Sequence, residues 1–187
     1  MKPMRLLMLP MLVLGLGGCV LMGPSYTEPV DFDLGVPAAE AVKPAALPIR
    51  FGVFRNLSGS NRGFLVRESG DRLSSDEYNR WLLSPELLLQ RRIRTELPDP
   101  AGEMGKSVRL NATIYRFEFD RTRHTAVLSV EFSGKAGDVT ERTSQLTYET
   151  PYEGDAPEEA AKAMVVNAEK AAQAVRELIA SLSKKLK

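Results

Sequence analysis

This sequence contains few of the side chains on which most catalytic and metal sites depend. Its 187 residues include one cysteine, one histidine and one tryptophan. A hydrolase with a serine or cysteine nucleophile needs a base beside it, and the single histidine, His124, is predicted at the edge of a turn. No Cys/His pair offers a zinc site, and one cysteine cannot form a disulfide within the chain. We therefore predict that the protein is not an enzyme and holds no metal or cofactor.

The carboxylates and glycines do not suggest a catalytic site either. Asp31 and Asp33 lie in a proline-rich segment and Glu158-Glu159 begin a predicted helix, so solvated or capping roles are favoured over an acid/base pair. The glycines of residues 15–18 belong to an apolar N-terminal segment, not to a phosphate-binding loop. The 25 Lys and Arg residues nearly balance the 24 Asp and Glu residues. This balance indicates neither nucleic-acid binding nor a polybasic membrane patch.

The start of the chain has the order of segments of a secretory signal peptide. Positive residues precede the apolar run Leu6–Leu16, and Gly17-Gly18-Cys19 follows. The run is about half of the roughly 20 apolar residues that a membrane-spanning helix needs. The small-small-Cys ending resembles the bacterial lipobox, which implies cleavage of residues 1–18 and a membrane anchor of diacylglyceryl and N-acyl (palmitate) chains on Cys19. An ordinary cleaved signal, with Cys19 incidental, is the alternative.

The residue after the cysteine bears on the membrane to which the anchor attaches. In enteric bacteria an Asp at this place retains lipoproteins in the inner membrane, whereas this chain has Val20. The resemblance to the lipobox therefore implies a periplasm-facing lipoprotein of the outer membrane, with the inner membrane as the less favoured site. Loss of Lys2 and Arg5 with the signal changes the formal net charge from +1 to −1.

Residues 19–47 are predicted to form a lipidated, proline-rich tether. Proline removes backbone donors, so no strand or helix is expected to persist over residues 20–47, and their root-mean-square reach is roughly 30 Å. Within this tether, the short segment Asp31–Gly35 is predicted to adopt a β-like conformation or to dock on another surface. A single domain is expected over residues 48–187. The prolines of the tether are Pro24, Pro29, Pro37 and Pro44.

Apolar periodicity predicts the elements of this domain. Strands are expected at Ile49–Phe54 and Phe64–Arg67, with a loop around residues 70–76. A three-strand meander is expected over residues 108–150, and a phase change at residues 114–115 suggests either a bulge or a strand covered on both faces. Ser84-Pro85-Glu86 has the residues of a helix start, and Pro98 ends that helix.

The chain is predicted to end in a long helix that begins near Asp155. Apolar residues recur in it at spacings of three and four, which is typical of packing on a sheet and is favoured here over a coiled coil. The order β-β-α-β-β-β-α predicts an α+β, two-layer sandwich of a mainly antiparallel sheet with two helices. The recurring residues are Met164, Ala168, Ala171, Val175, Leu178 and Leu182.

Two sets of aromatic residues are candidates for binding a partner. Tyr78 and Trp81 precede the first helix, and aromatic residues are common anchors at interfaces; closure of the core by Trp81 is the favoured alternative. Tyr115, Phe117 and Phe119 alternate along one strand. If the helices cover only the opposite face of the sheet, this stripe would be an exposed apolar surface that can bind a partner. If the helices cover the face that carries the stripe, it would belong to the core.

Several short features together resemble the ABC-type transport auxiliary lipoprotein family (PqiC/YmbA-like). They are Phe32-Asp33-Leu34-Gly35, the strand Ile49–Phe54, Phe64–Arg67 ending in an arginine, and Tyr78 and Trp81 before the helix that starts at Pro85. A three-strand meander and a long C-terminal helix complete the layout. None of these features is catalytic.

The resemblance implies a non-catalytic accessory or docking component of intermembrane lipid or hydrophobic-molecule transport. Its implied partners are the membrane, a mammalian-cell-entry (MCE) domain protein and the components of an ABC transporter; a homo-oligomer is left open. Two alternatives remain at this point. One is a lipid-binding lipoprotein chaperone, which requires an apolar pocket between sheet and helix. The other is an outer-membrane activator of a cell-wall synthase.

Overall fold

The computed structural model describes residues 27–100, 106–139 and 141–186. The signal segment and Cys19 lie outside these residues, so the lipidation prediction is not tested by the fold. The seven strands are β1 (Val30–Phe32), β2 (Ile49–Asn56), β3 (Gly63–Ser69), β4 (Arg72–Trp81), β5 (Val108–Asp120), β6 (Thr125–Ala136) and β7 (Arg142–Pro151). The helices are the short 3-10 turn η1 (Ala39–Ala41), α1 (Pro85–Glu96) and α2 (Pro157–Lys185).

All seven strands belong to one mixed sheet in the order β1-β4-β3-β5-β6-β7, with β2 also paired to β5. The long ladders β5–β6 and β6–β7 and the β3–β4 hairpin are antiparallel, while β1–β4, β2–β5 and β3–β5 are parallel. Two strands share one edge of β5, because β2 pairs with its residues 108–114 and β3 with Phe119 and Asp120.

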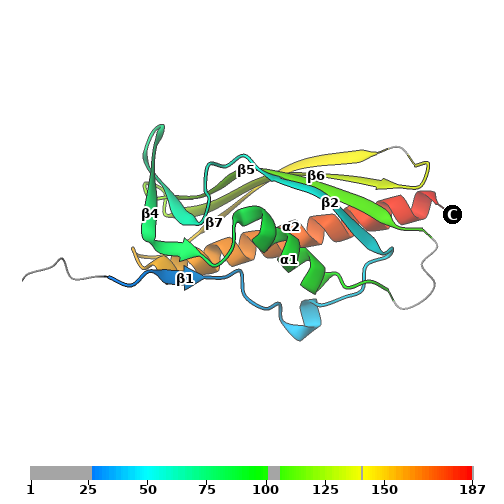
Figure 1. Cartoon of the computed structure of the whole chain (residues 1–187), viewed down its shortest axis with the longest axis horizontal. Helices are drawn as coiled ribbons and strands as arrows, with labels where there is room; N and C mark the ends of the chain where they lie inside the picture. Colours follow the sequence, from blue (N-terminus) through cyan, green and yellow to red (C-terminus); the bar gives the residue numbers. More distant parts are fainter. Residues whose placement is uncertain (1–26, 101–105, 140, 187) are drawn as a thin grey trace, which may run out of the picture.

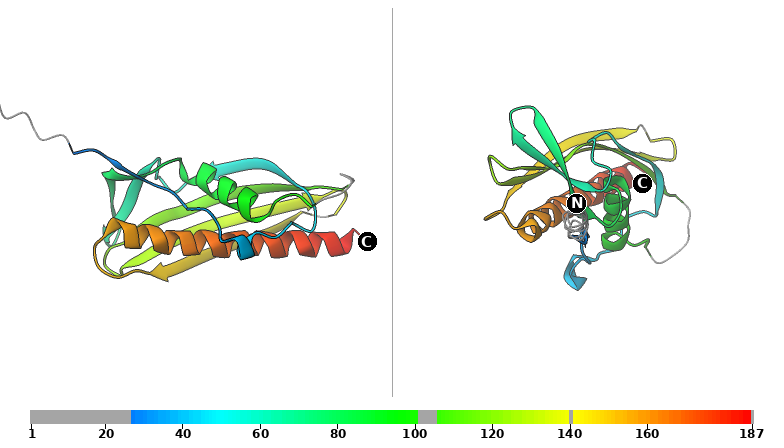
Figure 2. Two further views of the ribbon diagram at one scale, coloured as in Figure 1. Left: turned by 90° about the horizontal axis from the view of Figure 1, so that it is seen from below. Right: turned by 60° about the vertical axis from the view of Figure 1, so that its left-hand side comes forward.

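Both helices lie on the same side of this sheet (Figure 1). The long helix α2 runs the length of the molecule against β6 and β7, and α1 lies beside it over β2 and β5. Figure 2 shows the β3–β4 hairpin projecting away from α2 at the end where the described chain begins. The predicted α+β sandwich with two helices is therefore confirmed.

The space between α2 and the sheet is closely filled. Met164, Ala168, Ala171, Val175 and Leu182 are all 0% exposed, as expected for a helix that packs on a sheet through small residues. At Gly134 of β6, a Cβ would lie 3.1 Å from Leu182 Cδ1, so even one methyl group would crowd the helix. The contact between α2 and the sheet is therefore a packed core.

Residues 27–47 do not form a free tether, and this prediction is wrong for the part that packs on the domain. β1 pairs with residues 79–81 of β4, and Leu34 and Ala45 are buried. The backbone oxygen of Leu34 accepts a hydrogen bond from Arg92 Nη1 at 2.5 Å, and that of Ala41 accepts one from Arg176 Nη2 at 3.0 Å. The segment is held by α1 and α2, and the β-like character expected of Asp31–Gly35 is confirmed at β1.

The remaining elements largely match their predictions. A register shift between Ile114 and Arg116 confirms the expected bulge in β5. The prediction of a loop around residues 70–76 is wrong, because Gly70 and Asp71 form a tight turn and β4 begins at Arg72. Arg72, Ser74 and Asp76 are polar residues that give no apolar alternation, and the hairpin with β3 determines their conformation instead.

Candidate docking site

An aromatic cluster lies at the end of the sheet where the described chain begins. Phe64 packs against Trp81, Phe119 and Phe32, with ring centroids 4.7, 4.8 and 4.9 Å apart respectively. Phe119 also contacts Tyr152 edge to face at 6.2 Å. These rings come from β1, β3, β4, β5 and the segment after β7, so the cluster joins the N-terminal segment, the hairpin and the central strands.

Three of the five predicted partner-binding residues belong to this core and not to the surface. Trp81 is 0% exposed, and Phe117 and Phe119 are 1% and 3% exposed. The bulge at Tyr115 explains the difference for β5, because the extra residue turns Phe117 and Phe119 to the helix-covered side. The favoured alternative for Trp81, closure of the core, is what the structure shows.

Tyr78 lies at the surface because β4 bulges outward. Phe64 of β3 pairs with Asp76, whereas the preceding Gly63 pairs with Arg80, so residues 77–79 have no partner on β3. The Asp76 carboxylate holds the bulge, accepting bonds from the backbone N–H groups of Tyr78 at 2.9 Å and Asn79 at 3.1 Å and from the Asn79 side chain at 2.7 Å. The Tyr78 side chain is 59% exposed.

Hydrogen bonding also determines the ionisation of Asp76. Burial alone would raise the pKa of this carboxyl group, but the amide and backbone donors of Asn79 and Tyr78 outweigh burial and lower it below its ordinary value. Asp76 is therefore negatively charged at neutral pH, when the bulge needs it as an acceptor.

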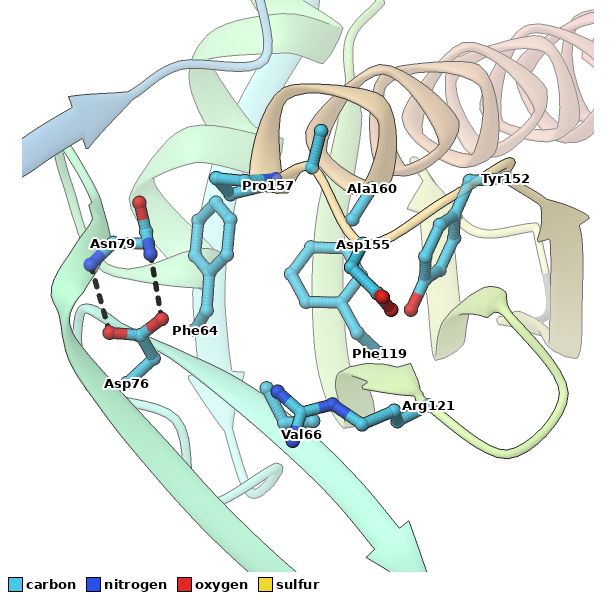
Figure 3. Close-up of a pocket in the computed structure, with 11 residues that line it drawn as sticks. Phe64, Val66, Asp76, Asn79, Phe119, Arg121, Tyr152, Asp155, Pro157 and Ala160 are labelled. Carbon is cyan, nitrogen blue, oxygen red and sulfur yellow. Dashed lines mark hydrogen bonds between the residues drawn. The ribbon is translucent and has the colours of Figure 1, made fainter.

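A pocket of about 390 Å³ opens beside this bulge, between the β3–β4 hairpin and the first turn of α2 (Figure 3). Figure 3 shows the rings of Phe64, Phe119 and Tyr152 in a row below that turn. Polar side chains surround them, so the pocket combines an aromatic floor with charged walls. Its lining residues are Phe64, Val66, Asp76, Asn79, Phe119, Arg121, Tyr152, Asp155, Ala156, Pro157 and Ala160.

The charged walls are held in place by their own contacts. Arg121 Nη1 pairs with Glu68 on β3 at 2.8 Å, and its backbone N–H donates to the Arg67 oxygen at 3.0 Å. Burial raises the pKa of the Tyr152 hydroxyl, so this group is a neutral donor at physiological pH. The pocket can therefore offer a cation, a hydroxyl and apolar ring surface to an incoming side chain.

More apolar surface lies next to the pocket along the β1–β4 edge. Val30 is 50% exposed and pairs with Asn79, which lines the pocket. Leu82, 43% exposed, follows β4, and its N–H donates to the Phe32 oxygen at 2.7 Å. We call the pocket together with Val30, Tyr78 and Leu82 the docking face.

The fifth predicted residue, Tyr115, lies at a separate place on the sheet. It is 38% exposed at the β5 bulge, and the neighbouring Leu57, 62% exposed, is held there by a bond from its N–H to the Ile114 oxygen at 2.8 Å. The structure therefore divides the predicted residues among two surfaces and the core. Sequence reasoning missed the pocket itself, because its residues come from strands that are far apart in the chain.

The outer face of the sheet beside the pocket has a network of ion pairs. Glu118 is buried between Arg67 and Arg116, with nitrogen–oxygen distances of 2.8 and 2.5 Å. Asp120 accepts from Arg123 Nε and Thr122 Oγ1, each at 2.8 Å. Burial alone would raise the pKa of Asp120, but these hydrogen bonds outweigh it and lower the pKa to about 2.

These features define an α+β sandwich with a surface pocket at the end where its N-terminal segment packs. No protein-family model matches the sequence, and no curated protein matches it. An uncharacterized protein of known structure aligns with a TM-score of 0.63 at 13% identity, over 81% of this chain and 99% of its own. A Xanthomonas campestris protein of the DUF330 family aligns with a TM-score of 0.58 at 13% identity, over 85% and 96%. These similarities establish a shared fold.

A third solved structure, a candidate lipoprotein of Caulobacter crescentus, aligns with a TM-score of 0.40 at 16% identity, over 71% of this chain and 89% of its own. That score is too low to establish a common fold. Within the described residues, no helix is long and apolar enough to cross a membrane, and no group of three or more His, Cys, Asp or Glu side chains is arranged to hold a metal ion.

Proposed function

We propose that this protein is a non-catalytic, lipid-anchored docking component of an ABC transporter–MCE protein system that moves lipids or other hydrophobic molecules between membranes. In this proposal Cys19 carries the acyl anchor in the outer membrane, and the docking face binds the periplasmic MCE-domain protein. The resemblance of the sequence to the auxiliary lipoprotein family and the fold shared with a DUF330 protein support it.

The observation that carries the proposal is the docking face. A partner side chain can enter the pocket of about 390 Å³ and contact its aromatic floor, while Tyr78 stands beside the pocket 59% exposed. Buried aromatic anchors surrounded by polar groups carry most of the binding energy at protein interfaces. The Asp76 bonds fix the bulge before binding, so little order has to be gained on association.

The position of β1 limits how far this face can stand from the anchor. Because Val30 is already paired to β4, only the chain between Cys19 and Val30 can act as the linker between the acyl anchor and the domain. Eleven steps of extended chain span at most about 40 Å. The domain is therefore kept close to its membrane, as expected for a component that docks the end of a partner arriving from the opposite membrane.

The same structure weighs against the two alternatives. A lipid chaperone requires an apolar cavity between sheet and helix, but the side chains of α2 fill that space, with Ala168, Ala171 and Val175 0% exposed. A synthase activator must reach through the cell wall. The chain between Cys19 and Val30 spans at most about 40 Å, less than half of the about 90 Å that a fully extended tether up to residue 47 would span.

Affinity purification from cells tests this function. The lipidated chain is crosslinked in cells, and its partners are identified by mass spectrometry beside a Cys19→Ala control. Recovery of an MCE-domain protein or an ABC transporter component, lost or strongly reduced in the control, is expected. Recovery of a cell-wall synthase, or of a bound lipid without any protein, would contradict the proposal.

A further inference from the structure

Three cations lie side by side on the outer face of the sheet, at the end opposite the docking face. Arg50 of β2 pairs in register with Arg109 of β5, and Arg109 pairs with Lys135 of β6. All three side chains are exposed. Neighbouring strands lie about 4.8 Å apart, so three positive charges occupy a row about 10 Å long across the sheet.

Like charges directly opposite one another on a sheet destabilise it, and this row has no internal compensation. Within the described residues, no carboxylate lies within ion-pairing distance of any of the three side chains, whereas Arg62, Arg67, Arg91 and Arg121 each pair with an acid. Within the part of the chain that the structure describes, these three cations are therefore not paired with an acid, which is also true of the exposed Arg72.

The row lines an open pocket of about 410 Å³. Gly52 forms part of its wall, where any Cβ would collide with Asn111 Oδ1 and would lie 3.1 Å from Arg109 Nε, so the arginine side chain crosses directly over the glycine. Ser107 and Gly137, the latter at a φ of +54°, also line the pocket and add small, polar surface. The backbone at Gly52 and Gly137 therefore forms part of the pocket wall beside the three cations.

From this arrangement we propose that Arg50, Arg109 and Lys135 form a binding pocket for a phosphate group. Phosphate presents several oxygens to several donors at once, and arginine binds it through two parallel N–H groups while lysine supplies a point charge. The site does not depend on the docking proposal, because α2 spans about 43 Å between the two ends. The phosphate can belong to a phospholipid headgroup or to a free anion.

Binding by the mature chain, residues 19–187 with Cys19→Ala, tests the site without an acyl anchor that would itself enter membranes. Inorganic phosphate is titrated against the protein and followed through the amide NMR signals of Arg109 and Lys135. Cosedimentation with phosphatidylglycerol vesicles, with phosphatidylcholine vesicles for comparison, is measured at physiological salt. Movement of these signals with vesicle binding assigns the ligand to a lipid headgroup, and movement without vesicle binding assigns it to a free phosphate.

Two matched triple variants distinguish binding at this pocket from a general effect of the protein's positive charge. Arg50→Gln, Arg109→Gln and Lys135→Gln together remove three charges from the row, and Lys43→Gln, Arg72→Gln and Lys170→Gln remove three exposed charges elsewhere. The first variant is expected to weaken phosphate or vesicle binding at least tenfold, and the second less than twofold. Equal losses in the two variants, or no phosphate binding by the parent chain, would overturn the proposal.

Discussion

At the residue scale, Asp120 links the folding stability of this protein to pH. Its carboxylate accepts bonds from Arg123 and Thr122, which lower its pKa from 3.8 to about 2. A carboxyl group whose pKa is depressed in the folded state contributes stability that is fully present above its unfolded pKa. That contribution is lost as the pH falls through the folded value.

Replacing Asp120 with Asn should therefore destabilise the protein by about 1–3 kcal/mol at pH 7, because the charged acceptor of three hydrogen bonds is lost. The difference from the parent chain should shrink between about pH 4 and pH 2. Urea unfolding at several pH values measures both quantities. A difference that stays constant down to pH 2 would show that Asp120 is not the linked group.

Tyr78 and Trp81 are three residues apart and have opposite roles. Trp81→Ala removes a fully buried ring that contacts Phe64 and Phe117, and should cost about 3–5 kcal/mol of unfolding free energy. Tyr78→Ala removes an exposed ring and should change that free energy by less than about 0.5 kcal/mol. Thermal and urea unfolding of the two variants check this, and comparable losses in both would place Tyr78 in the core.

At the element scale, the N-terminal segment acts as part of the folded domain. Leu34 is 1% exposed beside the buried Arg92, whose Nη1 donates to the Leu34 oxygen. Leu34→Ala should cost about 2–5 kcal/mol and make the chain before residue 48 more sensitive to protease. Val36→Ala, at a residue 87% exposed, is the control and should behave like the parent chain. Equal stability of the two variants would mean that the segment is only loosely attached.

Enlarging a buried side chain, instead of truncating one, tests how closely α2 approaches the sheet. Ala171 is fully buried at this contact, so Ala171→Leu adds methylene groups where there is no space and should destabilise the protein by about 1–3 kcal/mol. Gln173→Leu, on the exposed side of the same helix, should change stability by less than about 0.5 kcal/mol. A stabilising effect of Ala171→Leu would reveal a cavity under the helix.

Elements with clear apolar periodicity were predictable, and those determined by pairing were not. The helix start at Pro85 and the stripe along α2 follow directly from spacing. β4 was missed because Ser74, Ser75 and Asp76 carry no strand pattern, and its conformation depends on the hairpin with β3. The bulge at Tyr115 was anticipated, but its consequence for Phe117 and Phe119 depends on which face the helices cover, which the sequence does not specify.

At the scale of the whole molecule, two different surfaces lie at opposite ends of α2. The docking face adjoins β1 and the start of α2, and the phosphate pocket adjoins the end of β6, where Leu186 approaches Gly137. Tyr78 of the docking face was predicted from the sequence, but neither pocket was, because each collects residues from several strands. In the proposed function, an acyl anchor on Cys19 would keep the docking-face end near its membrane. The second end lies about 43 Å away along α2.

Site-specific photocrosslinking in cells tests whether the docking face binds an MCE-domain protein. A photoreactive residue replaces Tyr78 on the docking face or Gln145 on the exposed side of β7, and crosslinked partners are identified by mass spectrometry. We expect an MCE-domain protein to be captured at position 78 and not at position 145. Capture of that protein equally at both positions, or no capture at position 78, would show that the docking face is not its binding surface.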